Sequence, residues 1–168
     1  YEQEVENLIA SLKEFGIPYD IEGIESQGSW IANVRYRVNF LLRKLDEYRQ
    51  PIVWIDADGV VVQYPKLFDT MNADIALHYF NGQSLGGTMW FNDNDNAREI
   101  LRSWDKRSDA KYKLDQRYLQ DVLENPKYNV YRLPPSYTHI FDMMVGDPVI
   151  LHNQASRRFK GQVNARTT

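Results

Sequence analysis

The sequence predicts an α/β fold in a single domain, with a mixed, mostly parallel central sheet flanked by helices over residues 1–168. Amphipathic helical patterns alternate with short apolar runs through the first half of the chain. The length of 168 residues is ordinary for one domain, and no linker, repeat or low-complexity stretch divides it.

The first two expected elements are helices with a strand between them. Residues 2–15 place apolar side chains at helical spacing, and Gly16 then supplies a stop. Residues 18–24 alternate weakly in polarity and predict a strand. Ser29 suits the N-cap of a second helix that runs to about Tyr48.

A short, continuously apolar run from Pro51 to Ile55 predicts a central parallel strand. Asp56-Ala-Asp-Gly59 follows directly at the carboxyl end of this strand. The remaining expected elements are a turn or short helix at 65–68, strands at 74–79, 85–91, 128–132 and 149–151, and helices that begin at Asp93 or Asp95 and at 115–124.

Composition and charge exclude several classes of site. The chain has no cysteine, which excludes disulfides, thiolate zinc sites and cysteine nucleophiles. The net charge of −3 argues against a nucleic-acid partner. No apolar run approaches the roughly 18 residues of a membrane span, and no signal peptide is recognisable. We therefore expect no membrane span and a cytoplasmic location.

The basic residues gather at the end of the chain. No acidic residue follows Asp147, whereas four basic residues do. Such a segment can bind phosphate, or it can be a solvated tail. Charge alone leaves both readings open.

Asp56 and Asp58 are the residues on which the functional prediction depends. In open α/β sheets, ligands bind outside the carboxyl ends of the strands, where this pair is expected. Two carboxylates one residue apart can reach the same cation, and oxygen ligands suit Mg²⁺ or Mn²⁺. Such a cation would offset the charge of a leaving diphosphate. The structural alternative is a strand-end turn, in which Asp and Gly are common.

The segment Trp54-Ile-Asp-Ala-Asp58 resembles the Asp-x-Asp motif of nucleotide-diphospho-sugar transferases with the GT-A fold. The upstream helix with Asn33 and Arg37, which share one helix face, resembles the helix that precedes this motif. The resemblance implies a metal-dependent glycosyltransferase that uses a nucleoside-diphosphate sugar, with UDP-sugars favoured, and an unknown acceptor. It implies that Arg37 lies near the donor or the motif's carboxylates, and that Asn33 and Asp56 also face the donor.

Two downstream segments extend this resemblance. Gly87-Thr-Met-Trp-Phe-Asn92 is similar to the strand that lines the sugar side, which implies that Trp90 stacks on a sugar ring and that Asn92 binds hydroxyls. A core position is the alternative for Trp90. Asp115-Gln116 resembles the pair that opens a helix beside the donor sugar in retaining transferases, and this implies a catalytic role. A helix N-cap is the alternative for Asp115.

The two ends of the chain complete the resemblance. GT-A enzymes commonly add a late His as a metal ligand, which implies a cation held by Asp56, Asp58 and His152. In some relatives a Tyr near the position of Tyr1 stacks on uracil, although we expect the usual first strand to end before this residue. Basic residues beyond the late His clamp the diphosphate, and here these are Arg157, Arg158 and Lys160.

Two other functions remain as alternatives. A haloacid-dehalogenase-like phosphatase would use Asp56 as nucleophile and Asp58 as general acid/base. That motif normally opens its fold, however, and here two predicted helices precede it. A non-catalytic sugar-nucleotide-binding domain is the third reading, and the small size of the chain motivates it. We interpret His78 and the Asp93–Asn96 cluster as structural, the latter as a helix cap.

Overall fold

The computed structural model describes residues 2–25, 30–107 and 115–153, without the side chains of 30–35, 107, 115 and 116. Within these ranges, no helix is long and apolar enough to cross a membrane. The helices are α1 (Glu2–Glu14), α2 (Trp30–Tyr48), α3 (Asp95–Arg107) and α4 (Asp115–Leu123), with 3₁₀ turns η1 (Lys66–Thr70) and η2 (Pro135–Thr138). The strands are β1 (Ile52–Ile55), β2 (Gly59–Val61), β3 (Ile75–Phe80), β4 (Gln83–Phe91), β5 (Val130–Arg132), β6 (His139–Ile140) and β7 (Ile150–His152).

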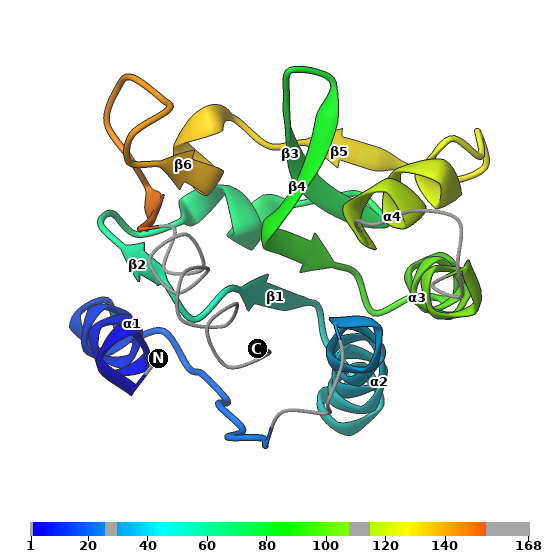
Figure 1. Cartoon of the computed structure of the whole chain (residues 1–168), viewed down its shortest axis with the longest axis horizontal. Coiled ribbons are helices and arrows are strands. Elements are labelled where there is room, and N and C mark those ends of the chain that lie inside the picture. The colour runs from blue at the N-terminus through cyan, green and yellow to red at the C-terminus, as the bar shows by residue number, and fades with distance from the viewer. Residues whose placement is uncertain (1, 26–29, 108–114, 154–168) are drawn as a thin grey trace, which may run out of the picture.

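The larger sheet has the strand order β1-β4-β3-β5 (Figure 1). β4 is antiparallel to both β1 and β3, and only β3 and β5 pair in parallel. The α/β class and the mixed sheet are therefore confirmed, and β1, β3 and β5 run in one direction. The expectation of mostly parallel pairing was wrong, because two of the three neighbouring pairs are antiparallel.

A tight hairpin causes this difference. Asn81 and Gly82 have φ of 50° and 75°, and Phe80 pairs with Gln83 across them. Positive φ at both central residues is the signature of a two-residue type I′ turn, for which Asn-Gly is the preferred sequence. The chain therefore reverses directly from β3 into β4 and leaves no room for a crossover helix.

A second, three-stranded sheet has the order β2-β7-β6, with β2 antiparallel and β6 parallel to β7. Neither β2 nor β6 was predicted, because three- and two-residue strands carry too little periodicity to be recognised. The β2–β7 register pairs Gly59 with His152. This pairing joins the segment that follows the Asp-x-Asp motif to the end of the described chain.

Two hydrophobic clusters lie on opposite faces of the larger sheet. α2, α3 and α4 cover one face, and α1 lies on the other side, as Figure 1 shows. Side chains alternate between the faces along β4, since Met89 and Phe91 join the helical cluster while Trp90 joins the cluster that contains Leu8 and Leu12 of α1. β4 thus contributes side chains to both hydrophobic clusters.

Residues 18–24 form an extended coil, so the strand predicted there was wrong. Their polar side chains bind α2 and not a neighbouring strand. Asp20 accepts hydrogen bonds from Lys44 at 2.5 Å and from the Tyr48 hydroxyl at 2.7 Å. Glu22 contacts Arg43 at 2.9 Å on the same helix. The weak alternation of polarity marks which side chains face α2.

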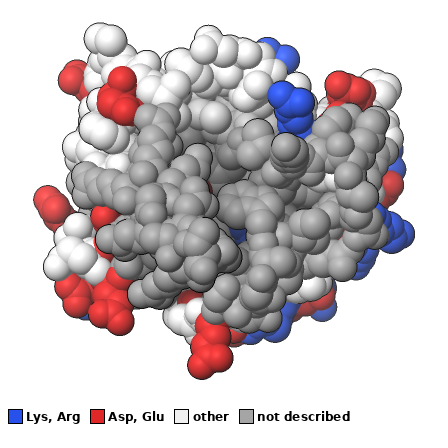
Figure 2. All heavy atoms as spheres, in the orientation of Figure 1, with Lys and Arg blue, Asp and Glu red and all other residues white. Residues whose placement is uncertain are grey.

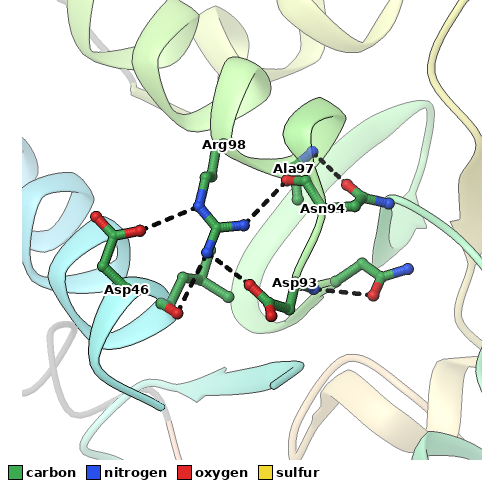
Figure 3. A network of polar contacts seen from close by, with 7 residues as sticks. Asp46, Asp93, Asn94, Ala97 and Arg98 are labelled. Carbon is green, nitrogen blue, oxygen red and sulfur yellow. Dashed lines mark hydrogen bonds and ion pairs between the residues drawn. The ribbon is translucent and has the colours of Figure 1, made fainter. Parts of the chain in front are cut away.

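A polar network fixes the start of α3 (Figure 3). The Asn94 side chain accepts the Ala97 N–H at 2.8 Å, so Asn94 caps the helix and the reading of this cluster as a cap is confirmed. The Arg98 guanidinium reaches Asp93 at 2.5 Å and Asp46 of α2 at 3.1 Å. Arg98 therefore ties α3 to both the preceding loop and α2.

Charge is distributed unevenly over the described surface. In Figure 2, acidic side chains gather on the side of α1, and basic side chains lie on the side of α2 and α3. Several of the α2 cations are already bound, since Arg43 and Lys44 hold Glu22 and Asp20. These charges join the coil to the helix.

Candidate functional site

β1 delivers Asp56 to the end of the larger sheet. The Asp56 N–H donates to the Gly87 carbonyl at 2.8 Å, which extends the β1–β4 ladder by one residue. The Trp54 indole N–H donates to Asp56 Oδ1 at 2.7 Å, and Arg37 Nη1 lies 3.9 Å from the same oxygen. The backbone of Asp56 is therefore fixed by β4, and its carboxylate contacts two side chains.

Arg37 is itself held between two indoles. Its guanidinium carbon lies 5.6 Å from the centroid of the Trp54 ring and 4.9 Å from that of Trp104. Both distances lie within the range of cation–π attraction. The structure thus places Arg37 beside the first carboxylate of the motif, as the resemblance implied.

Burial raises the pKa of the Asp56 carboxyl above its usual range, and the Arg37 charge and the Trp54 N–H offset only part of this effect. The side chain still keeps 43% of its surface exposed. A cation bound beside this carboxyl would favour its ionised form.

Asp58 and His152 form the second half of the site. His152 Nδ1 lies 3.4 Å from Asp58 Oδ1, and His152 Nε2 lies 2.8 Å from the Thr88 hydroxyl. The imidazole is almost fully buried, and only 2% of the residue is exposed. Contacts at both nitrogens fix the orientation of the ring, because a flipped ring would turn carbon atoms toward both partners.

Two glycines make room for the imidazole. A Cβ on Gly87 would lie 3.0 to 3.3 Å from three atoms of the His152 ring. A Cβ on Gly59 would lie 3.4 Å from His152 Cε1 and only 2.4 Å from Ile55 Cγ2. Glycine in a strand often marks such a close approach. Gly59 and Gly87 thus create the cradle in which the ring lies against β4.

The Asp58–His152 pair fits the geometry of two ligands of one cation. Two donor atoms that each lie about 2.1 Å from a metal are roughly 3.0–3.5 Å apart for bond angles between about 90° and 110°. The separation between Nδ1 and Oδ1 is 3.4 Å. Across the described residues, no group of three His, Asp or Glu side chains could hold a metal ion. A cation here would need further oxygens, such as those of water or a diphosphate.

Thr88 can support a metal role for His152. A metal-bound imidazole usually donates its other N–H to an oxygen, which fixes the tautomer. If Nε2–H donates to the Thr88 hydroxyl, the lone pair of Nδ1 is directed toward Asp58. The ring nitrogen that faces the carboxylate is then the one that can bind a cation.

Two predicted donor-binding residues need correction. Trp90 is only 3% exposed and packs in the core with Leu8 and Leu12, so it has no face for a sugar ring. Asn92 donates to the Ala73 carbonyl at 2.8 Å and accepts the Asp93 N–H at 2.8 Å. Because β4 runs antiparallel to β1, Asn92 also lies at the opposite end of the sheet from Asp56.

Several predicted site residues lie outside what the structure describes. Asn33 belongs to α2, and Asp115 and Gln116 open α4, but their side chains are not described. Tyr1 and the basic residues near the end of the chain, Arg157, Arg158 and Lys160, fall outside the described ranges altogether.

Trp54, Thr88 and the two glycines are parts of the site that were not predicted from the sequence. Trp54 and Asp56 are two residues apart on an extended segment and so share one face, a signal that was available. Thr88 and Gly87 could be recognised only from the antiparallel pairing, which brings the middle of β4 to the end of β1.

The fold is shared with solved glycosyltransferases. A glycosyltransferase involved in glycosylation of the major capsid of PBCV-1 superposes with a TM-score of 0.67 at 14% identity, covering 99% of this chain and 92% of that one. The WbbM bifunctional glycosyltransferase gives 0.57 at 16% identity and covers 77% of this chain, which spans only 33% of that enzyme. Mouse xyloside xylosyltransferase 1 gives 0.53 at 11% identity, covering 92% and 73% of the two chains. No protein-family model matches the chain, and no curated protein matches in sequence.

Proposed function

We propose that this chain is a metal-dependent glycosyltransferase that moves a sugar from a nucleoside-diphosphate sugar, with UDP-sugars favoured, to an acceptor. The observation that carries the proposal is the Asp58–His152 pair at 3.4 Å, located beyond β1 in a fold shared with glycosyltransferases. The ligand end of such a sheet is where a nucleotide is expected.

In this proposal Asp58 and His152 Nδ1 hold Mn²⁺ or Mg²⁺, with the Asp56 carboxylate beside them. The cation, when bound, supplies positive charge against the diphosphate that leaves. Thr88 accepts the Nε2–H of His152 and so keeps Nδ1 available. Arg37, which lies 3.9 Å from Asp56 Oδ1, reduces the repulsion between the two carboxylates, and we propose that it also faces the anionic donor.

The remaining roles rest on the sequence resemblance. We propose that Asp115 and Gln116 contact the donor sugar, and that Tyr1 and Asn33 contribute to the nucleotide side. We further propose that the late basic residues bind the diphosphate and that the protein acts in the cytoplasm. The basic residues are Arg157, Arg158 and Lys160.

A calorimetric titration with uridine diphosphate, in the presence and absence of Mn²⁺, tests the metal assignment. We expect binding that requires Mn²⁺ and that Asp58→Ala abolishes, because only one protein ligand of the pair remains. Asp147→Ala is the matched control, since it removes an exposed carboxylate from the β6–β7 loop. Equal, metal-dependent binding by Asp58→Ala and by the control would remove Asp58 from the site.

The same protein distinguishes the alternatives. A phosphatase would hydrolyse simple phosphomonoesters, and Asp56→Asn would abolish that activity. A non-catalytic binding domain would bind the nucleotide with Mn²⁺ and never release sugar from any donor. The likeness of the fold to glycosyltransferases gives the phosphatase alternative no support.

A further inference from the structure

Trp54 packs against the hydrophobic core on one side and contacts the first carboxylate of the motif on the other. We propose that Trp54 is a positioning residue for the donor site, whose indole N–H holds Oδ1 of Asp56 so that Oδ2 faces the ligand. This inference rests on the proposed function, because it assigns a task to Asp56 in binding the metal–nucleotide complex.

The contact between the two side chains is short. Trp54 Nε1 lies 2.7 Å from Asp56 Oδ1, at the short end of hydrogen bonds from N–H to a charged oxygen. An indole has one N–H and no acceptor, so this contact uses its whole hydrogen-bonding capacity. Side chains alternate between the two faces of an extended segment, so those of residues 54 and 56 lie on the same face and can contact each other directly.

Contacts with α2 and β4 hold the Trp54 ring. The Phe40 ring meets it edge to face, with centroids 6.2 Å apart and an interplanar angle of 75°. The Arg37 guanidinium lies over it at 5.6 Å, and Met89 is its partner in the β1–β4 register. A ring with these neighbours has little rotational freedom, and its N–H is fixed in direction before any ligand arrives.

The fixed N–H determines how the carboxylate is presented. Trp54 and Arg37 both contact Oδ1, and neither of these contacts uses Oδ2. These two contacts at Oδ1 restrict the rotation of the carboxylate, and in the proposal Oδ2 is the oxygen that is offered to the ligand. Without the N–H, the carboxylate could rotate, and ligand binding would have to restrict that rotation.

The contact can be tested without any ligand. In protein labelled with ¹⁵N-tryptophan, the chain's four Trp residues should give four indole N–H signals, and Trp54→Phe assigns one of them by its loss. We expect this signal to shift strongly in Asp56→Ala, because the charged acceptor is removed. A Trp54 signal that stays in place in Asp56→Ala would refute the positioning role, whatever the protein binds.

The consequence is tested by calorimetry with uridine diphosphate and Mn²⁺. Trp54→Phe keeps an aromatic ring for Phe40 and Arg37 but lacks the N–H, and we expect its affinity for the complex to fall about tenfold. Tyr48→Phe is the matched control, since it also removes a donor that lies 2.7 Å from a carboxylate oxygen, that of Asp20, three turns of α2 away from Arg37. Its affinity should stay within about twofold of the wild type.

The outcomes separate this inference from the proposed function. Wild-type affinity in Trp54→Phe, or an equal loss in Tyr48→Phe, would refute the positioning role and leave the proposed function standing. Absence of nucleotide binding by the wild type would refute the proposed function instead. Thermal unfolding of each variant shows that it is folded, and if Trp54→Phe does not fold, the response of the indole signal to Asp56→Ala decides the question.

Discussion

We expect Gly87→Ala to disrupt the site by displacing the imidazole ring of His152. The added methyl carbon would lie 3.0 Å from His152 Cε1, 3.2 Å from Nδ1 and 3.3 Å from Nε2. Ordinary contacts between such atoms are about 3.5–4.0 Å, so the imidazole must move by roughly 0.5 Å. A shift of that size disturbs both the 2.8 Å contact with Thr88 and the 3.4 Å contact with Asp58.

Gly87→Ala should lower both the stability of the protein and its affinity for the metal, because the His152 ring is buried and is also a proposed metal ligand. Inserting a methyl group into a packed site costs about 1–3 kcal/mol, which Ala in place of Gly in a strand offsets by about 0.5–1 kcal/mol. For a domain of this size, a net loss of about 1–2 kcal/mol lowers Tm by roughly 2–8 °C. Changes in the shell around a metal ligand typically reduce metal affinity about 10–100-fold, and we expect a loss in that range.

The assay pairs thermal unfolding with calorimetric titration of Mn²⁺ and uridine diphosphate. Gly23→Ala is the control, because a Cβ at Gly23 would meet no atom within 4 Å and no positive φ is involved. If Gly87→Ala matches Gly23→Ala in both Tm and affinity, then the close approach between Gly87 and His152 has no functional meaning and the described cradle is wrong.

Three further predictions address the supports of the site and of the fold. Thr88→Val should lower Mn²⁺ affinity about tenfold in calorimetry, because His152 Nε2 loses its partner, and an unchanged affinity would contradict the tautomer assigned here. Arg98→Met should lower the unfolding free energy in urea by about 2 kcal/mol with nucleotide binding intact, since the guanidinium joins α3 to α2 away from the site; altered binding would contradict this separation. Lys44 holds the pKa of Asp20 below its usual range, so the stability that Asp20 adds is present above about pH 4 and is lost as the pH falls through the folded-state pKa. The stability difference between the wild type and Asp20→Asn should therefore shrink on acidification, and a constant difference from pH 7 to pH 3 would contradict this account.

Asp58 and His152, the central pair of the site, were both among the residues expected from the sequence. The apolar run before Asp-x-Asp predicted Asp58 at the end of a strand, and the resemblance to GT-A transferases implied His152 as a ligand of the same cation. The structure brings these two side chains within 3.4 Å. The position of Asp58 follows from the local sequence, whereas His152 was expected only from the resemblance, because its contact with Asp58 forms in the tertiary fold. The metal itself stays a prediction.

Strand direction could not be predicted in the same way. A short apolar strand looks alike in parallel and antiparallel sheets, so nothing in the sequence showed that Asn92, which the resemblance implied, lies at the far end of β4 from the motif. The Asn81-Gly82 turn reverses the chain and brings Thr88 beside the motif instead. The same uncertainty affects Trp90, since a one-residue change of position along a strand exchanges the two faces.

The pairing of β2 with β7 could not be predicted from the local sequence either. Three residues from Gly59 to Val61 carry no periodicity, yet their register places His152 directly opposite Gly59. Only the tertiary fold brings segments so distant in sequence together. The space that Gly59 leaves for the imidazole is visible only in that context.

Release of sugar from a nucleotide donor is the most direct test of the central claim. The wild-type protein, incubated with a panel of nucleoside-diphosphate sugars and Mn²⁺, should release free sugar and nucleoside diphosphate from at least one donor. Asp58→Ala and wild-type protein in a chelator should release none. Cleavage that persists without metal, hydrolysis of simple phosphomonoesters in place of donor cleavage, or metal-dependent nucleotide binding without any sugar release would contradict a metal-dependent glycosyltransferase.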